Sequence, residues 1–379
     1  MLAATASIDE IRKDAGAREV RLYLEVERGE WLLPRAAFLL QEKLNAYASF
    51  VFDGKMRELY PFVQPHDVRI VVRSQGQPPQ DALREAARER RPRAALLIDS
   101  PDFNLRLARR LRELRIPVTC FIGPSVWAWR TYRVRQIARD VARMLVILPF
   151  EAQFYAEHGV KATYVGNPLA DSLRTPQKPD GSPPLDRSRP ILALLPGSRA
   201  QEIRRIWPPM LAAARRLKAA HPDLQLVVPV APTIDPAQLE SADIVLVPGR
   251  APEVLAAARA AVVASGTATL EAALALTPLV VVYRTSWLTW LIGRLLVRVR
   301  HVSLVNLLAG RTLVPELLQS RCTPETISAA VEPLLSDSRE RVAQLEGLRT
   351  IRAELAPPGS PAAARRAAEE VLALLEEHR

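Results

Sequence analysis

The chain has 379 residues, of which 49% are hydrophobic and 25% are charged, a composition that excludes disorder, collagen and coiled coils and suffices for two domains with separate cores. No apolar run reaches the roughly 18 residues that a membrane-spanning helix needs, and no leader-like segment follows Met1, so we expect a cytoplasmic chain. The net charge of +11 favours an anionic partner: a phosphorylated substrate, an acidic membrane surface or nucleic acid.

The first 80 residues differ in pattern from the rest. Residues Arg21–Arg28 and Val68–Arg73 alternate apolar with polar side chains, which predicts half-exposed antiparallel strands. The aromatic-rich segment Trp31–Tyr60 predicts a helix. We therefore expect residues 1–80 to form an atypical α+β segment.

From about residue 94, unbroken apolar runs alternate with helical patterns such as Phe103–Leu114 and Ile203–Ala220. Unbroken runs predict parallel strands that are buried on both faces. The chain is thus expected to be α/β and doubly wound. The predicted strands are Ala94–Ile98, Pro117–Ile122, Met144–Leu148, Ile191–Leu195, Leu224–Val230, Ile244–Val247, Ala260–Ala264 and Leu279–Tyr283.

A proline-rich break at residues 173–189 predicts a linker between two Rossmann-like domains. Such domains would face each other across a cleft at the carboxyl ends of their strands, where α/β proteins bind ligands. The predicted division is 1–80 (atypical segment), 81–172 (remainder of the first domain), 173–189 (linker), 190–345 (second domain) and 346–379 (helices packing back on the first domain).

The spacing of glycine and histidine excludes several common sites. The closest glycines, Gly159 and Gly166, are seven residues apart, whereas GxGxxG and GxxxxGK phosphate loops need shorter spacings. The five histidines are scattered, so no metal site is expected. The two cysteines, Cys120 and Cys322, exclude a disulfide scaffold.

The segment Leu97–Asn104, LIDSPDFN, ends a predicted strand with two carboxylates. A carboxylate at this end of a parallel strand can serve as a general base, which favours Asp99. The alternative is that Asp99 or Asp102 only caps the following helix.

Next, residues 123–130 read GPSVWAWR. Ser125, Trp127, Trp129 and Arg130 are candidates for contact with a sugar or a lipid, since aromatic faces beside a cation suit both. The alternative is that one of the tryptophans fills the core.

Two strand–turn–helix segments in the second half of the chain indicate a binding site for a diphosphate. In Leu194–Glu202, LLPGSRAQE, backbone N–H groups at the helix start and the charge of Arg199 can bind an anion. The alternative is a capping box of Ser198 with Gln201 or Glu202.

The second such segment, Ala264–Glu271, reads ASGTATLE. Ser265, Gly266 and Thr267 form another small-residue turn before a helix, and Glu271 can accept hydrogen bonds from ribose hydroxyls.

Finally, the basic helix predicted at Trp287–Arg300 carries Trp287 and Trp290 among arginines. This composition is typical of helices at an anionic lipid surface. The alternative is a buried amphipathic helix.

Taken together and in this order, the segments resemble the lipid-A-disaccharide synthase family over roughly residues 85–350. The resemblance implies a GT-B fold, no metal or other cofactor, and transfer of 2,3-diacylglucosamine from its UDP derivative to 2,3-diacylglucosamine 1-phosphate. It also implies peripheral association with the cytoplasmic side of the inner membrane. The segments are LIDSPDFN, PSVWAWR, LPFE (148–151), VGNPLAD (165–171), LLPGSR, ASGTATLE, VVYR (281–284) and NLLAGR…VPELLQ (306–319).

By the same resemblance, Asp99 corresponds to the base that deprotonates the acceptor hydroxyl and Arg199 to the arginine that stabilises the leaving diphosphate. The positions that correspond to the UDP site are Ser198, Ser265, Gly266, Thr267, Glu271 and Asn306. Two departures stand out: the family's first apolar strand and GExSGD loop are missing, and Val305 stands where the family usually has proline.

These departures leave alternatives open. One is a UDP-sugar-binding protein with weak or no catalysis, because the acceptor-side glycine-rich loop is missing. Others are a different UDP-sugar chemistry on the same fold, such as N-acetylglucosaminyl transfer or 2-epimerisation, and nucleic-acid binding, for which no module is recognisable.

Overall fold

The computed structural model describes residues 10–14, 19–26, 68–74, 87–88, 92–128, 131–172, 185–231, 233–239, 242–287, 290, 300–357, 359 and 362–377. The chain forms two compact units, Met1–Val118 and Thr119–Arg379. The five-part division expected from the sequence stays a prediction, and most of its linker, residues 173–184, lies outside the described residues.

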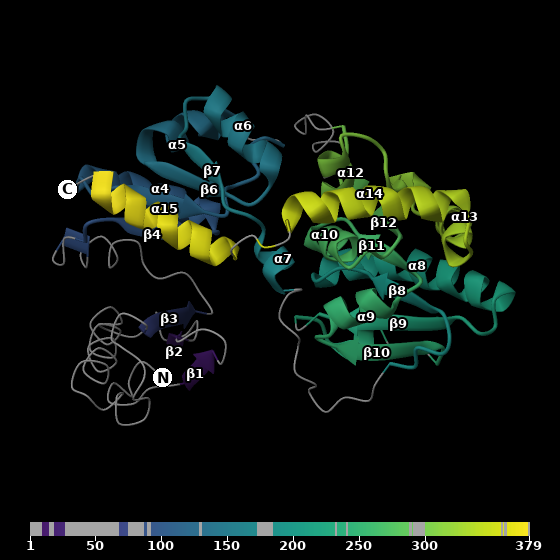
Figure 1. Ribbon diagram of the computed structural model, residues 1–379. Helices are drawn as coiled ribbons and strands as arrows, with labels where there is room; N and C mark the ends of the chain where they lie inside the picture. Colours follow the sequence, from purple (N-terminus) through teal and green to yellow (C-terminus); the bar gives the residue numbers. More distant parts are fainter. Residues whose placement is uncertain are drawn as a thin grey trace. The chain divides into compact units, whose positions relative to one another are not determined.

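A three-stranded sheet of order β1-β2-β3 lies near the N-terminus (Figure 1). Its strands are β1 (Glu10–Asp14), β2 (Glu19–Val26) and β3 (Val68–Ser74). The two strands predicted here are confirmed, and β2 pairs antiparallel with β1. However, β3 pairs parallel with β2, so the antiparallel expectation is wrong for β3. The helix expected at Trp31–Tyr60 falls outside the described residues.

A four-stranded sheet of order β4-β5-β6-β7 follows, in which β5, β6 and β7 run parallel. The short strand β7 was not predicted from the sequence. Strands are β4 (Ala95–Ile98), β5 (Val118–Phe121), β6 (Arg143–Val146) and β7 (Ala162–Tyr164). Helices are α4 (Pro101–Glu113), α5 (Val134–Asp140), α6 (Pro149–Glu157) and α7 (Pro168–Ser172).

A six-stranded parallel sheet of order β10-β9-β8-β11-β12-β13 forms the second half. Its strands are β8 (Ile191–Leu195), β9 (Gln225–Val230), β10 (Ile244–Pro248), β11 (Ala260–Ala264), β12 (Leu279–Tyr283) and β13 (Glu316–Leu318). Its helices are α8 (Ala200–Ala220), α9 (Ala251–Ala257), α10 (Thr267–Leu274), α12 (Leu304–Ala309), α13 (Pro324–Leu335) and α14 (Arg339–Leu355). Short 3-10 turns lie at Thr131–Arg133, Pro236–Gln238 and Gln319–Arg321.

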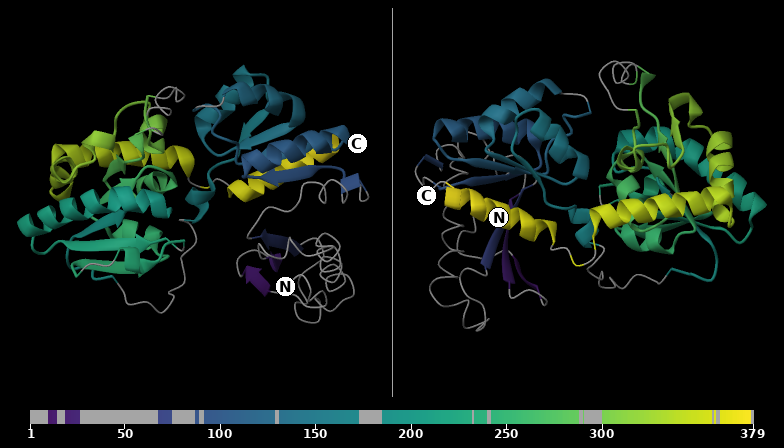
Figure 2. Two further views of the ribbon diagram at one scale, coloured as in Figure 1. Left: turned by 180° about the vertical axis from the view of Figure 1, so that it is seen from behind. Right: turned by 45° about the horizontal axis from the view of Figure 1, so that its top comes forward.

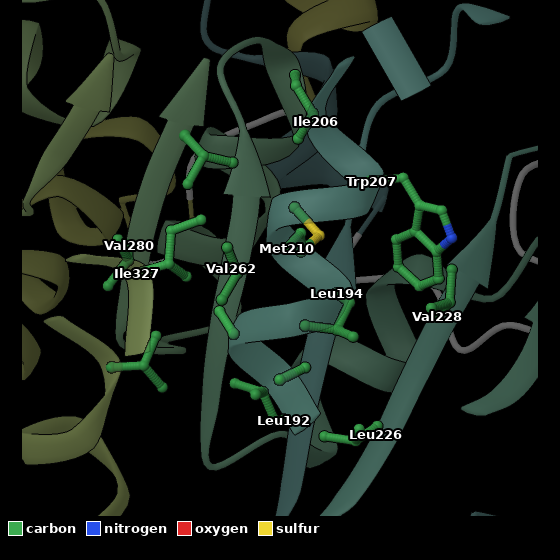
Figure 3. Packing of buried hydrophobic residues seen from close by; sticks show 14 of the residues in the cluster. Leu192, Leu194, Ile206, Trp207, Met210, Leu226, Val228, Val262, Val280 and Ile327 are labelled. Carbon is green, nitrogen blue, oxygen red and sulfur yellow. The ribbon is translucent and has the colours of Figure 1, made fainter. Parts of the chain in front are cut away.

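Helices cover both faces of this sheet, which explains why its strands are unbroken apolar runs. Leu192 and Leu194 of β8 point to one face, where they pack with Met210 of α8 and Ile327 of α13 (Figure 3). The alternate residues of β8 pack on the other face with α9, α10, α12 and α14. Because successive side chains of a strand point to opposite faces, a strand between two helix layers must be apolar at every position.

The expectation of burial on both faces is wrong for two strands. In β4, Leu96 is 41% and Ile98 54% exposed, and in β10, Val245 is 49% exposed. Both strands are the last in their sheets among the described strands, and a strand at an edge has a neighbour on one side only.

The C-terminal stretch is helical and breaks around Pro357 and Gly359, as the sequence predicts. After the break, α15 (Ala363–Glu377) packs beside the strands β5–β7 (Figure 2). Ala367 joins Phe121, Leu145 and Val165 in one apolar cluster, and Arg143 of β6 forms ion pairs with Glu370 and Glu377. The last helix is thus held to these strands by both apolar contacts and charge.

Candidate active site

A pocket of about 390 Å³ opens at the carboxyl ends of the strands in the six-stranded sheet. Its lining comes from the segments that follow β8, β9, β10 and β11, which is where ligands bind in open α/β sheets. The pocket brings together six of the predicted site residues: Ser198, Arg199, Ser265, Gly266, Thr267 and Glu271.

The turn between β8 and α8 forms one wall of the pocket. Gly197 adopts a φ of 114°, a conformation that residues with a side chain rarely adopt. Helix α8 begins at Ala200 with Arg199 at the N-cap and no side-chain cap hydrogen bond, so the alternative of a Ser198 capping box is wrong. The first N–H groups of a helix lack a partner one turn back, and Ser198, Arg199 and Glu202 at this helix start line the pocket.

Arg199 is exposed and forms an ion pair of 2.9 Å with Glu202, one turn into α8. Glu202 also lines the pocket, and its second carboxylate oxygen would lie 2.9 Å from a Cβ atom at Gly197. Gly197 therefore leaves the room that this carboxylate occupies. From the sequence Glu202 was predicted only as a capping residue, and its ion pair with Arg199 was not predicted.

The turn between β11 and α10, which follows the strand next to β8, also lines the pocket. Gly266 is the N-cap, with a φ of 153°, and Thr269 Oγ1 donates a hydrogen bond of 2.8 Å to its carbonyl oxygen. Ser265 N donates to Val282 O over 2.9 Å, and Ser265 Oγ to Val302 O over 3.3 Å. These bonds fix a turn of small residues against the pocket.

Glu271 lies one turn into α10 and is half-buried. Burial raises the pKa of its carboxyl group above the ordinary value, since a charged group loses hydration when it leaves water. Within the described part of the chain, its carboxylate has no hydrogen-bond or ion-pair partner. It is therefore available to accept hydrogen bonds from a ligand.

Asn306 lies outside the lining of this pocket and is fully buried. Its Oδ1 accepts from Leu313 N (2.8 Å) and Val314 N (2.9 Å), and its Nδ2 donates to Val314 O (2.9 Å) and a carboxylate oxygen of Glu316 (2.9 Å). The side chain thus ties α12 to the segment before β13. The contact with UDP expected of Asn306 stays a prediction.

Glu316 was not singled out from the sequence, although it stands in the quoted segment VPELLQ. It accepts hydrogen bonds from Val302 N, Ser303 N and Ser303 Oγ as well as from Asn306. A carboxylate between apolar neighbours was the signal that could have found it, because such a group needs donors. Together, Glu316 and Asn306 hold the segment whose Val302 carbonyl contacts Ser265.

Asp99 lies in the other compact unit, directly after β4, and is exposed. Its carboxylate has no hydrogen-bond or ion-pair partner among the described residues. The alternative that Asp99 or Asp102 caps α4 is wrong, because Ser100 is the N-cap and makes no side-chain cap hydrogen bond. Asp102 lies in the first turn, where a negative charge is favourable.

Trp127 of the segment GPSVWAWR is anchored by α6. Its Nε1 donates a hydrogen bond of 3.0 Å to Glu151, and Phe150 packs edge-on against its ring at 5.0 Å. Trp127 also packs against the apolar cluster that contains Ile191 and Leu195 of β8. It therefore contributes to the core, as the alternative interpretation predicted. Ser125 is exposed, and Trp129 and Arg130 lie outside the described residues.

Glu151 is 2% exposed, and burial raises the pKa of its carboxyl group to about 6. The hydrogen bonds from Trp127, Leu148 and Ile147 act in the opposite direction and lower the pKa, but burial has the larger effect. Glu151 stands in the segment LPFE, where its sequence pattern alone indicated no role. The structure makes it the anchor of Trp127.

The two tryptophans expected at a lipid surface lie at the start of a segment of which little is described. Trp287 is 74% exposed and Trp290 is half-buried; residues 288–289 and 291–299 lie outside the described residues. Across the described helices, none combines the length and the apolar character needed to cross a bilayer.

The profile of the family described as lipid-A-disaccharide synthetase matches residues 79–370. Curated relatives named lipid-A-disaccharide synthase include one from Anaeromyxobacter dehalogenans (strain 2CP-C), 53% identical over 307 residues, or 77% of this chain and 78% of the relative. Another, from Myxococcus xanthus, is 52% identical over 302 residues, with the same coverage of both chains.

Similar solved structures include a UDP-GlcNAc 2-epimerase from Neisseria meningitidis (TM-score 0.54, 11% identity, 94% of this chain and 100% of that chain). Another is the calicheamicin glycosyltransferase CalG4 (TM-score 0.50, 18% identity, 95% and 99%). At these identities the likeness concerns the fold, and it confirms the GT-B class. With the family profile and relatives above half identity agreeing, the chain belongs to the lipid-A-disaccharide synthase family, glycosyltransferases of lipid A biosynthesis that act on lipid A precursors.

Proposed function

We propose that this chain transfers the 2,3-diacylglucosaminyl group of its UDP derivative to 2,3-diacylglucosamine 1-phosphate, with Asp99 as base and Arg199 at the leaving group. One observation carries the proposal: the turns after β8 and β11 line a single pocket together with the Arg199 side chain. Two helix starts and a cation beside one cavity provide N–H groups and positive charge for a diphosphate.

In the proposed reaction, the Asp99 carboxylate takes the proton of the acceptor 6-hydroxyl as O6 attacks C1 of the donor sugar. The bond from C1 to the β-phosphate oxygen breaks, and its electron pair leaves with UDP. Arg199 and the N–H groups at the start of α8 stabilise the charge that develops on the diphosphate. Because attack and departure occur on opposite faces of C1, the configuration at C1 inverts, so an α-linked UDP donor gives the β-linked disaccharide.

The pocket residues divide between the parts of UDP. Ser198, Ser265, Gly266 and Thr267 are proposed to contact the diphosphate through the two turns. Glu271 is proposed to accept hydrogen bonds from the ribose, because its half-buried carboxylate has no partner in the described chain. Asn306 is proposed to act through the segment that it holds.

The acceptor is proposed to lie near Ser125, Trp127, Trp129 and Arg130. Support comes from the anchoring of Trp127, which fixes the start of this segment on α6. An anchored loop with aromatic and cationic side chains suits the binding of a phosphorylated sugar.

We also propose that the chain works in the cytoplasm at the surface of the inner membrane, with Trp287 and Trp290 at the lipid. The exposed ring of Trp287, the exposed Arg284 and the net charge of +11 support this. The Trp287→Ser/Trp290→Ser variant is expected to bind anionic vesicles more weakly in a flotation assay. Tyr132→Ser, at another exposed aromatic residue, is the control; unchanged binding of the double variant contradicts the proposal.

The decisive test is a radiolabelled disaccharide assay with the purified full-length chain and Asp99→Asn. The variant is expected to lose transfer while its UDP affinity stays near wild type, because Asp99 and the UDP pocket lie in different compact units. Full activity of Asp99→Asn removes Asp99 as the base. A wild-type chain that binds UDP without forming disaccharide would instead support the alternative of a UDP-sugar-binding protein.

A further inference from the structure

The turn between β4 and α4 passes through the left-handed backbone region at two consecutive residues that are not glycine. Asp99 has a φ of 52° and Ser100 a φ of 42°. Such a conformation is unfavourable for a residue with a side chain, and it persists only where its surroundings hold it in place. The cost falls on the residue proposed as the base and on its neighbour.

The side-chain amide of Asn104 holds this turn. Its Nδ2 donates to the carbonyl oxygen of Ile98 at 3.0 Å and to that of Asp99 at 2.5 Å. These two carbonyl groups belong to the peptide planes on either side of the Asp99 Cα atom. Fixing both planes fixes the φ and ψ angles of Asp99, and with them the direction of its Cα–Cβ bond.

No other polar contact of the described chain orients the Asp99 side chain, since its exposed carboxylate has no hydrogen-bond or ion-pair partner there. Its direction therefore depends on the backbone. Asn104 lies in the first turns of α4 and is 8% exposed. Asparagine is unfavourable inside a helix, and burying its amide group is costly unless the amide is hydrogen-bonded. The two bonds to the turn satisfy the amide.

We propose that Asn104 is a positioning residue for glycosyl transfer: by fixing both peptide planes that flank Asp99, it aims the carboxylate at the acceptor hydroxyl. The inference rests on the proposed role of Asp99 as base. A base must lie within hydrogen-bond reach of the proton that it takes, and a displacement of about 1 Å can cost about 100-fold in rate.

The test compares Asn104→Ala and Asn104→Asp with wild type. Asp has the shape of Asn, but its carboxylate cannot donate to the two carbonyl oxygens. Both variants are expected to lower kcat about 10- to 100-fold, while the KM for the UDP donor and the affinity for UDP stay within about 2-fold of wild type. If Asn104 only fills space, Asn104→Asp retains the wild-type kcat per folded molecule, which overturns the proposal.

A second substitution separates positioning from a general loss of structure. Glycine adopts the left-handed region without steric cost, so Ser100→Gly in the Asn104→Ala background is expected to restore part of the lost kcat. Ser100→Ala is the matched control, because alanine keeps the cost, and it is expected to restore nothing. Equal kcat in the two double variants overturns the proposal.

Should Asn104→Ala fail to fold, the same comparison is made with Ser100→Gly and Ser100→Ala in the Asn104→Asp background, with the same two outcomes. The Asp99→Asn variant separates the proposed role of Asp99 as base from the proposed positioning role of Asn104. If Asp99→Asn is active, the proposed base is wrong. If Asp99→Asn is inactive while Asn104→Ala and Asn104→Asp have wild-type kcat, the positioning role of Asn104 is refuted and the role of Asp99 as base is not.

Discussion

Arg199 and Glu202 form an ion pair of 2.9 Å at the wall of the pocket that follows β8 and β11. The same guanidinium group is proposed to meet the diphosphate of UDP, so Glu202 competes with the ligand for it. A diphosphate carries more negative charge than a carboxylate, which favours an exchange of partner when UDP binds.

Glu202→Gln is therefore expected to bind UDP more tightly, by about 2- to 5-fold, since an exposed ion pair contributes little. The measurement is UDP titration by calorimetry. Arg199→Ala is itself expected to weaken UDP binding and to slow transfer, and in that background Glu202→Gln is expected to have no effect on UDP affinity. Glu325→Gln, which removes an exposed ion pair with Arg216, is the control; weaker UDP binding by Glu202→Gln contradicts the competition.

Gly197→Ala is expected to weaken UDP binding at least 10-fold. The new Cβ atom would lie 2.9 Å from a carboxylate oxygen of Glu202, and the φ of 114° is unfavourable for alanine. The turn must then shift at the pocket wall. Gly159→Ala is the matched control, because Gly159 also has a positive φ but open space around it. Equal UDP affinity of the two variants would show that the close approach to Glu202 is unimportant.

Asn306→Leu is expected to lower the free energy of unfolding by about 2–4 kcal/mol, because it leaves the N–H groups of Leu313 and Val314 without their acceptor. Urea unfolding measures the loss. Gln344→Leu is the scaled control: Gln344 is also buried and accepts one hydrogen bond, from Leu279 N. A smaller loss for Asn306→Leu than for Gln344→Leu would refute the role of Asn306 as a clamp.

Glu151 makes stability depend on pH. Burial raises its pKa in the folded chain from the ordinary 4.5 to about 6, so folding favours the protonated form. The stabilisation is complete below about pH 4.5 and is lost as the pH rises through 6, a change of about 2 kcal/mol. The measurement is urea unfolding of wild type and Glu151→Gln at a series of pH values from about 4.5 to 7.

The difference in unfolding free energy between wild type and Glu151→Gln is expected to change by this amount across the interval and to be flat above about pH 7. Glu157→Gln, on the exposed part of the same helix, is the matched control. A difference that does not vary with pH would mean that folding leaves the pKa of Glu151 unchanged.

Much of the fold was predictable because it depends on local pattern. The unbroken run Ile191–Leu195 predicted β8 with its bounds, and the periodic segment Ile203–Ala220 predicted most of α8. The short strands β7 and β13 were missed, since three residues carry no periodicity. The burial of β4 was predicted wrongly, because the residues of a strand do not show whether the strand lies at the edge or in the middle of its sheet.

The sequence by itself determined the family and the strand–turn–helix segments of the pocket, since motif order and hydrophobic period are properties of neighbouring residues along the chain. Only the tertiary structure decided which partners those residues have: Glu202 for Arg199, Glu316 for Asn306, and Asn104 for the turn at Asp99. Hydrogen bonds and ion pairs depend on distances of about 3 Å and on backbone angles. Those distances arise only when the chain has folded. The left-handed turn at Asp99 could not be predicted either, because it contains no glycine.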